Sequence, residues 1–142
     1  AKPDIVGCNA ILNACIYSKK PMVKSDEAIM TAIEVFEHFR TSAPTYGFPN
    51  EDTYTFMMFA IHRLMDFGEK RMDLAETTFW YGADAGHVSK TFIYHLRDSV
   101  SKERLTKMLG DIVAFDSGSQ LKFNYDKVPE EWRRFVKPER ND

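Results

Sequence analysis

The chain has 142 residues, 44% of them hydrophobic and 13% aromatic, which is enough apolar material for the core of about one domain. Its formal net charge of -2 excludes a global cationic field, so any contact with nucleic acid must depend on a local basic patch. No apolar run approaches the ~20 residues of a membrane span, and we expect no membrane insertion.

The first predicted helix runs from residue 5 to about residue 18. Its apolar residues recur at intervals of three and four, the spacing of an amphipathic helix. These residues are Ile5, Cys8, Ile11, Leu12 and Cys15. Two cysteines two helical turns apart are too distant to form a disulfide with each other. We therefore expect both thiols to be buried and reduced rather than to act as a redox or metal-binding pair.

A second predicted helix starts after Ser25 and runs to about Arg40. Ser25 is a candidate N-cap because the acidic residues Asp26 and Glu27 follow it, in the first turn where the helix dipole favours them. One face of this helix carries Ile29, Ala32, Ile33, Phe36 and Phe39. Together the two segments predict a helical hairpin.

A second predicted hairpin follows a cluster of helix-breaking residues at 41–48 and opens at Pro49-Asn50. The apolar side of its first helix carries Tyr54, Met57, Met58, Ile61, Leu64 and Met65, and we expect this helix to end at Gly68. Its second helix covers about 69–85. There Ala75 and Phe79 correspond to Ala32 and Phe36, 43 positions earlier.

The segment that opens at Pro3-Asp4 thus returns, in degraded form, 46 positions later at Pro49-Asn50. Internal repetition at this scale is typical of stacked supersecondary units, which bury their apolar faces against their neighbours. A third and weaker copy begins after Gly86-His87. It continues into a short helix capped by Ser101 that reaches Leu109-Gly110.

The remainder of the chain predicts a terminal cap. A turn-rich loop at 116–119 precedes one or two helical turns within 128–135, where Trp132 and Phe135 are expected to dock onto the helices. We therefore predict an all-α fold, a helical-hairpin repeat solenoid with a short C-terminal cap. Its parts are a first repeat at 3–48, a second at 49–86, a partial third repeat or cap at 87–110 and a C-terminal extension at 111–142.

The stretches Pro3 to Val6, Asn9 to Cys15 and Ala32 to Arg40 resemble the pentatricopeptide-repeat family, and in particular the C-terminal repeats of algal members. The resemblance covers roughly residues 3–110. It implies an α-solenoid that binds single-stranded RNA, in which each repeat reads one nucleotide. By the resemblance, the base is read by a polar side chain near the start of the first helix and by another at the boundary with the next repeat.

In the first unit the resemblance assigns these reading positions to Asn9 and Asn50, a combination that favours pyrimidines in the family. Val6 matches the apolar residue that flanks the base. A helix-borne amide can both donate to and accept from one base edge, so the pair is chemically sensible.

The later units depart from the family pattern. In the second unit Thr55 is acceptable at the reading position, but Asp52 replaces the apolar flanking residue and Val88 occupies the boundary. In the third unit the reading position falls on Ile93, which cannot hydrogen-bond a base. One complete unit is too little for strong binding, so we expect upstream repeats, and any targeting segment, to precede Ala1.

Two further groups of residues are candidates for contacts with partners. Lys19, Lys20, Lys70 and Arg71 lie at equivalent loops between helices and could follow a phosphate backbone, although scattered solvated charge is the alternative. Trp80 and Tyr81 could pack against a neighbouring repeat, stack on a base or contact a protein partner.

Nothing in the sequence predicts an enzyme, a metal site or a cofactor. The four histidines (His38, His62, His87 and His95) are dispersed without ligand spacing. The acidic pairs Asp26-Glu27 and Glu130-Glu131 fit helix N-terminal charges better than an acid–base dyad.

Two functions therefore compete. The first is organellar single-stranded RNA binding, in a plastid or mitochondrion, that supports RNA processing, stability or translation. The second is a protein-protein scaffold or structural subunit of a larger organellar complex whose RNA-reading positions have degenerated. The near-neutral charge, Asp52, Ile93 and the pair Trp80-Tyr81 favour the second.

Overall fold

The computed structural model describes residues 4–18, 26–115 and 121–138, and these residues form a mostly helical protein, as predicted. The helices are α1 (Ile5–Ile16), α2 (Asp26–Thr41), α3 (Glu51–Leu64), α4 (Glu69–Ala85), α5 (Lys90–Ser99) and α6 (Lys102–Leu109). The candidate cap Ser25 lies outside the described residues. None of the described helices combines the length and the hydrophobicity needed to cross a bilayer.

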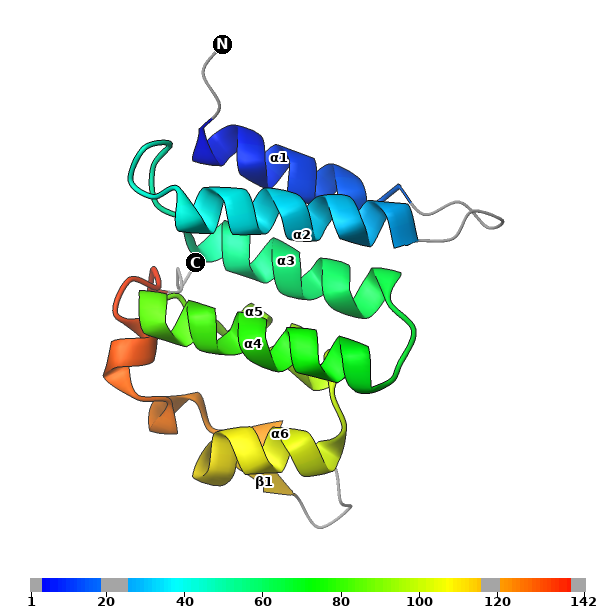
Figure 1. Cartoon of the computed structure of the whole chain (residues 1–142). Helices are drawn as coiled ribbons and strands as arrows, with labels where there is room; N and C mark the ends of the chain where they lie inside the picture. The colour runs from blue at the N-terminus through cyan, green and yellow to red at the C-terminus, as the bar shows by residue number, and fades with distance from the viewer. Residues whose placement is uncertain (1–3, 19–25, 116–120, 139–142) are drawn as a thin grey trace.

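The helices form two layers (Figure 1). α1, α3 and α5 lie side by side in one layer, and α2 and α4 lie in the other. Within each hairpin the second helix packs on the first, α2 on α1 and α4 on α3. In addition, α2 reaches α3 and α4 reaches α5, so each second helix bridges two neighbours of the first layer.

Corresponding residues of the two hairpins occupy corresponding places in the core. Phe36 of α2 meets the ring of Tyr54 on α3 edge to face at 5.7 Å, and Phe79 of α4 stacks on Phe92 of α5 at 5.6 Å. In the first layer the aligned residues Leu12 and Met58, 46 positions apart, are both fully buried. The residues that the sequence alignment pairs are therefore core residues.

The helix ends show how local sequence sets these elements. Asp4 caps α1 by accepting a hydrogen bond from the Gly7 amide at 2.8 Å. Asn50 caps α3 with a reciprocal capping box: its side chain accepts from the Thr53 amide, and its own amide donates to the Thr53 hydroxyl. Such a cap stabilises a helix by about 1 kcal/mol.

The predicted end of α3 at Gly68 is wrong, because the helix ends at Leu64 and its cap Met65 has an extended backbone (φ -108°, ψ 139°). Gly68 instead precedes α4 as its N-terminal cap residue. The early end is stabilised from outside the helix: the Arg71 guanidinium donates to the carbonyls of His62 and Met65, in the last turn and cap of α3.

The region after α6 contains two short strands that the sequence did not predict. β1 (Val113–Phe115) pairs antiparallel with β2 (Leu121–Phe123), flanked by single 3-10 turns at Gly110–Ile112 and Tyr125–Lys127. The predicted loop at 116–119 lies outside the described residues. Residues of high strand propensity, valine and phenylalanine, flank that loop, which accounts for the pairing.

The terminal segment docks onto α4 as predicted. A last 3-10 turn, Glu130–Arg133, brings the Trp132 ring edge to face with Phe79 at 5.7 Å and with Trp80 at 5.4 Å. Two backbone hydrogen bonds, from the Val88 amide to the Trp132 carbonyl (2.8 Å) and from the Phe135 amide to the Gly86 carbonyl (3.0 Å), fix the segment. The Phe135 side chain contacts His87 but stays 59% exposed.

Both cysteines are buried and free, as expected. Burial raises the pKa of the Cys8 thiol to about 11, so this thiol is neutral at physiological pH. It packs as a small hydrophobic residue.

Candidate nucleic-acid interface

The amide side chains of Asn9 and Asn50 come together where α1 and α3 meet. Asn9 Nδ2 donates to Asn50 Oδ1 at 3.0 Å, and Asn9 Oδ1 accepts from the buried Thr53 hydroxyl at 2.7 Å. Asn50 Oδ1 also accepts from the Thr53 amide at 3.1 Å. The two predicted reading residues are therefore adjacent, and Thr53 fixes the orientation of both amides.

Hydrogen-bonding capacity remains at this amide pair. The oxygens of both side chains are occupied, and one hydrogen of Asn9 Nδ2 is used. Among the described residues, Asn50 Nδ2 has no acceptor, and this side chain is exposed. The pair therefore offers amide donors toward solvent, the groups that the carbonyl oxygens of a pyrimidine accept from.

The other predicted reading residues divide between surface and core. Val6 is 73% exposed, Asp52 is exposed and Thr55 is half-buried, so all three can be reached from solvent. Val88 and Ile93 are buried in the core. Both side chains therefore contribute to core packing, and neither can contact a base.

Two pairs of aromatic and basic side chains lie on helices of the same layer. Tyr17, 62% exposed after the end of α1, meets Phe59 of α3 edge to face, and the Arg63 guanidinium lies 5.5 Å from the centre of the Tyr17 ring. On α5 the Arg97 guanidinium lies 5.1 Å from the centre of the Tyr94 ring. Aromatic rings and guanidinium planes are the groups on which unpaired bases stack.

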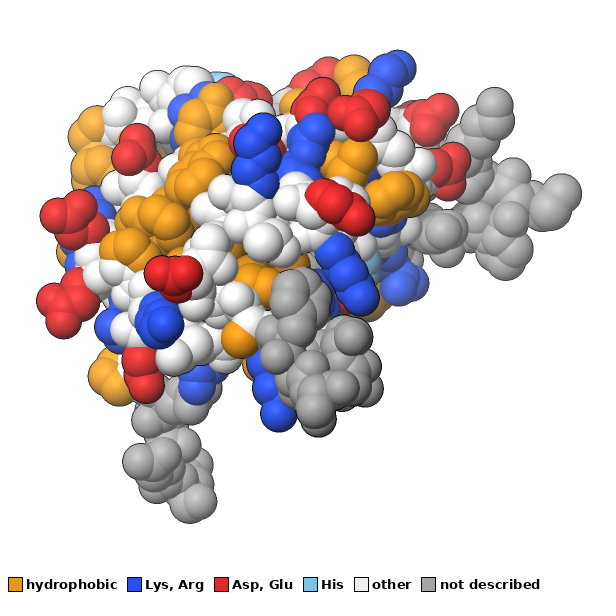
Figure 2. Space-filling model, turned by 90° about the horizontal axis from the view of Figure 1, so that it is seen from below, with side chains coloured by type: hydrophobic (Ala, Val, Ile, Leu, Met, Phe, Trp, Pro, Cys, Tyr) orange, Lys and Arg blue, Asp and Glu red, His pale blue; other side chains and the backbone are white. Residues whose placement is uncertain are grey.

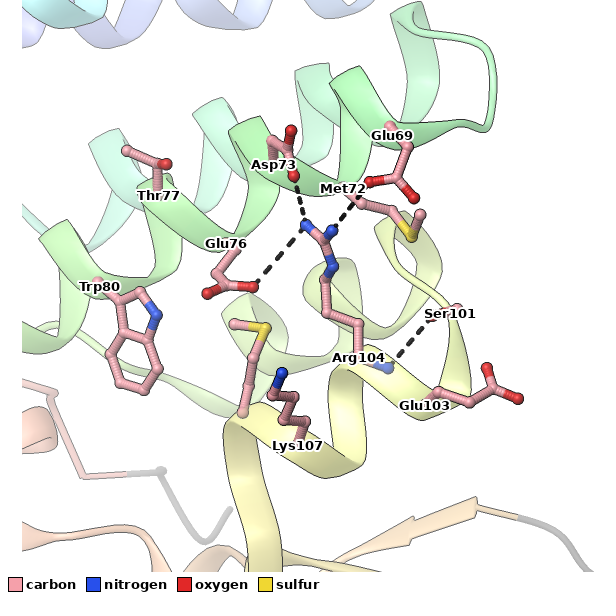
Figure 3. A pocket seen from close by; sticks show the side chains of 11 residues that line it. Glu69, Met72, Asp73, Glu76, Thr77, Trp80, Ser101, Glu103, Arg104 and Lys107 are labelled. Carbon is pink, nitrogen blue, oxygen red and sulfur yellow. Dashed lines mark hydrogen bonds and ion pairs between the residues drawn. The ribbon is translucent and has the colours of Figure 1, made fainter.

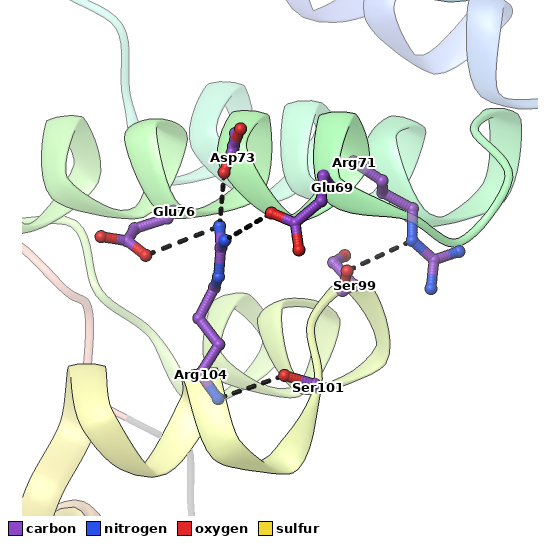
Figure 4. A network of polar contacts seen from close by, with 7 residues as sticks. All are labelled: Glu69, Arg71, Asp73, Glu76, Ser99, Ser101 and Arg104. Atoms are coloured by element: carbon purple, nitrogen blue, oxygen red, sulfur yellow. Dashed lines mark hydrogen bonds and ion pairs between the residues drawn. The ribbon is translucent and has the colours of Figure 1, made fainter.

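The candidate phosphate contacts have different environments. Lys19 and Lys20 lie outside the described residues, and Lys70 is exposed. Arg71 is half-buried and donates to the carbonyls of His62, Met65, Asp98 and Ser99 at 3.2 to 3.4 Å (Figure 4 draws the bond to Ser99). Burial lowers the pKa of Arg71, although it remains a cation. Its hydrogen bonds join the ends of α3 and α5, which gives it a structural role.

A groove of about 760 Å3 lies between α4 and α6 (Figure 3). At its centre the Arg104 guanidinium donates to Asp73 at 2.8 Å and to Glu69 at 3.1 Å, with Glu76 at 3.8 Å (Figure 4). Three carboxylates thus share one guanidinium. Glu103 and Lys107 also line the groove, which leaves its wall net acidic.

Trp80 and Tyr81 do not share a surface. Trp80 lines one end of the groove in Figure 3 and is 38% exposed, while its ring contacts Phe79 and Trp132. Tyr81 is half-buried and covered by the Arg40 guanidinium, 3.7 Å from its ring centre. Only Trp80 of the predicted pair lines this groove.

The surface below the helices carries both signs of charge. In Figure 2 acidic and basic side chains are interspersed beside a stripe of hydrophobic side chains, without a continuous basic face in that view. This agrees with the balanced composition of 19 basic and 21 acidic residues. On the face in that view, nucleic-acid contacts would draw on hydrogen bonds and stacking more than on net charge.

Sequence reasoning missed a cluster on the first layer. His62 of α3 and His95 and Asp98 of α5 each bring one ligand-type atom within 4.8 Å of the others. Burial lowers the pKa of both imidazoles, so both are neutral at physiological pH. The spacing of His95 and Asp98 was visible in the sequence, but His62 joins them only because α3 and α5 pack side by side.

Comparisons with protein-family models, with characterised proteins and with solved structures found no match to this chain. The family resemblance therefore remains a prediction from the residues quoted above. The class that the described fold defines is a two-layered stack of helical hairpins.

Proposed function

We propose that this protein binds single-stranded RNA across the face of α1, α3 and α5, as part of a pentatricopeptide-like solenoid. The observation that carries the proposal is the Asn9–Asn50 pair, whose amides meet at the start of α3 with donors left over. In this proposal, one pyrimidine is read by the pair, with Val6 flanking the base.

The cap of α3 supports this assignment of donors and acceptors. Because Asn50 Oδ1 must accept from the Thr53 amide to cap α3, its Nδ2 group is turned outward. A base that presents a carbonyl oxygen is favoured over one that presents a donor at that edge. Tyr17 and Tyr94, with their neighbouring guanidiniums, would stack on bases without regard to sequence.

The test compares amide variants for binding to short pyrimidine-rich and purine-rich single-stranded RNAs. Asn50→Asp keeps the cap, since a carboxylate also accepts from the Thr53 amide, but removes the outward donors. We expect Asn50→Asp and Asn9→Ala each to weaken binding to pyrimidine-rich RNA by about fivefold, the worth of about one hydrogen bond. Fluorescence anisotropy measures the affinities.

Asn13→Ala is the matched control because Asn13 is an exposed asparagine on the same helix. It should leave the preference unchanged. Tyr17→Ala should weaken binding to both RNAs alike, through lost stacking. Equal affinity of the unaltered protein for both RNAs, or unchanged preference in both amide variants, would contradict the proposal.

The resemblance places this activity in a plastid or mitochondrion, where it would support transcript processing, stability or translation. The exposed Asp52 and the buried Val88 and Ile93 limit the reading surface of this segment to about one nucleotide. Strong binding would then depend on further repeats upstream.

A specific observation favours the second candidate, a scaffold within a larger organellar complex. The groove between α4 and α6 is net acidic and has Trp80 at one end, so it fits a basic peptide segment of a protein partner. A lysine or arginine side chain could pair with the shared carboxylates and lie against the indole.

This candidate is tested with short arginine-containing peptides, whose binding is followed by tryptophan fluorescence because Trp80 lies in the groove. Binding should saturate, weaken with salt and fall about tenfold in the double variant D73N/E76Q. The control variant E130Q/E131Q removes two exposed carboxylates outside the groove and should leave the affinity for the peptide unchanged. If both variants weakened peptide binding equally, the binding would be general charge attraction, and the groove would be rejected as the peptide site.

A further inference from the structure

Three rings pack together where α3 and α5 meet. Phe59 lies 5.1 Å from His62 and 4.5 Å from His95, and the two imidazoles lie 5.2 Å apart, with interplanar angles of 6°, 25° and 23°. Three parallel rings in one column would put the outer two about twice as far apart. At least two of the rings therefore lie side by side, and Phe59 holds both imidazoles in place.

The chemistry of this cluster suits a metal ion. His95 Nδ1 is buried and has no hydrogen-bond partner among the described residues, an arrangement that normally calls for an unseen ligand or water. His95 and Asp98 are one helical turn apart on α5, so both project from the same side of that helix. His62 reaches them from the neighbouring helix α3.

From this arrangement we infer that His62, His95 and Asp98 form a binding site for a divalent transition-metal ion, with zinc the best match. Two imidazoles and one carboxylate are a common three-ligand set for zinc, which completes its tetrahedron with a water or an outside ligand. Imidazole ligands disfavour magnesium and calcium, which prefer oxygen.

Binding requires a small closure of the site. Ligand atoms around tetrahedral zinc lie about 3.3 Å apart, given zinc–ligand distances of about 2.0–2.1 Å, whereas here the three atoms lie within 4.8 Å of one another. The Asp98 side chain is half-exposed and, among the described residues, bonds through one oxygen to Arg97 at 3.1 Å, so it can rotate toward the imidazoles.

The charges around the site act in both directions. The lowered pKa of both imidazoles keeps their lone pairs free of protons at neutral pH, which favours metal binding. Arg63, Arg71 and Arg97 lie near enough to influence these pKa values and oppose a dication, while Asp98 favours it. Acidification should release the ion because the imidazoles then bind protons.

The experiment titrates zinc chloride into the whole chain by calorimetry and uses cobalt as a spectroscopic substitute. We expect one ion per chain and the intense visible bands of four-coordinate cobalt with nitrogen and oxygen ligands. His62→Ala, His95→Gln and Asp98→Asn should each weaken zinc binding at least tenfold. Zinc should also raise the melting temperature of the unaltered protein.

His38→Ala is the control, since His38 is an exposed histidine on α2 away from the cluster. Asp98→Asn guards against a folding defect because that side chain lies at the surface and its loss leaves the ring packing intact. No saturable zinc binding, or zinc binding in Asp98→Asn and His62→Ala as tight as in the unaltered protein, would overturn the inference. A thiolate-to-cobalt absorption band would place the ion on Cys8 or Cys15 instead and would also overturn it.

Discussion

Replacing Phe92 with alanine is expected to lower the free energy of unfolding by about 3–5 kcal/mol, the usual cost of deleting a fully buried aromatic side chain. Phe92 is completely buried on α5, stacks on Phe79 and meets Tyr54 edge to face. Its loss would leave a cavity where α3, α4 and α5 meet. Urea denaturation followed by circular dichroism measures the change.

A substitution on α4 that adds an atom next to the Phe92 ring tests the same contact. A Cβ atom at Gly82 would lie 2.7 and 2.8 Å from two carbons of the Phe92 ring, which is too close for an undisturbed core. Gly82→Ala should therefore destabilise the protein by about 1–3 kcal/mol although alanine is the better helix former. Tyr94→Ala, at an exposed position of α5, is the control for Phe92→Ala. A Phe92→Ala loss no larger than that of Tyr94→Ala would contradict the described core.

Replacing Arg71 with alanine should cost about 2–3 kcal/mol of stability, because hydrogen bonds from a charged donor contribute more than neutral ones. Four carbonyls at the ends of α3 and α5 would lose their common donor. Arg71→Lys keeps the charge but lacks the planar fork, so it should recover less than half of the loss. Chemical denaturation gives the values.

Lys70→Ala is the matched control for this change. Lys70 is the exposed neighbour of Arg71 and belongs to the same group of predicted phosphate contacts. Its replacement should change stability by less than about 0.5 kcal/mol. If Arg71→Ala were as harmless as Lys70→Ala, the carbonyl network would be wrong, and a role of Arg71 on the surface would again be favoured.

Local pattern predicted most of the helices. The three-four spacing of apolar residues identified α1 to α4 to within a few residues. Ser101 was predicted to cap α6, and in the structure its hydroxyl accepts a hydrogen bond from the Arg104 amide. These signals succeed because they depend on residues within one or two helical turns. The docking of Trp132 was predictable because a large aromatic residue in a polar tail needs a surface to cover it.

What the sequence did not predict depends on contacts between different helices and strands. The end of α3 at Leu64 is stabilised by Arg71 from the next helix, whereas the sequence indicated that the helix would end at Gly68. Strands of three residues are too short to show an alternating pattern. The candidate site residues were also predicted only in part. Asn9 and Asn50 were paired through the family resemblance of the first repeat, whereas no sequence pattern linked His62 to His95.

The docking of the terminal segment has a spectroscopic consequence. The two tryptophans of this chain, Trp80 and Trp132, lie edge to face with ring centres 5.4 Å apart, one on α4 and the other on the docked segment. Two indoles in such a fixed arrangement couple their electronic transitions, and the coupling disappears when the rings separate. The protein thus carries a built-in optical reporter whose signal follows the attachment of its C-terminal segment, independently of its helix content and without any added label.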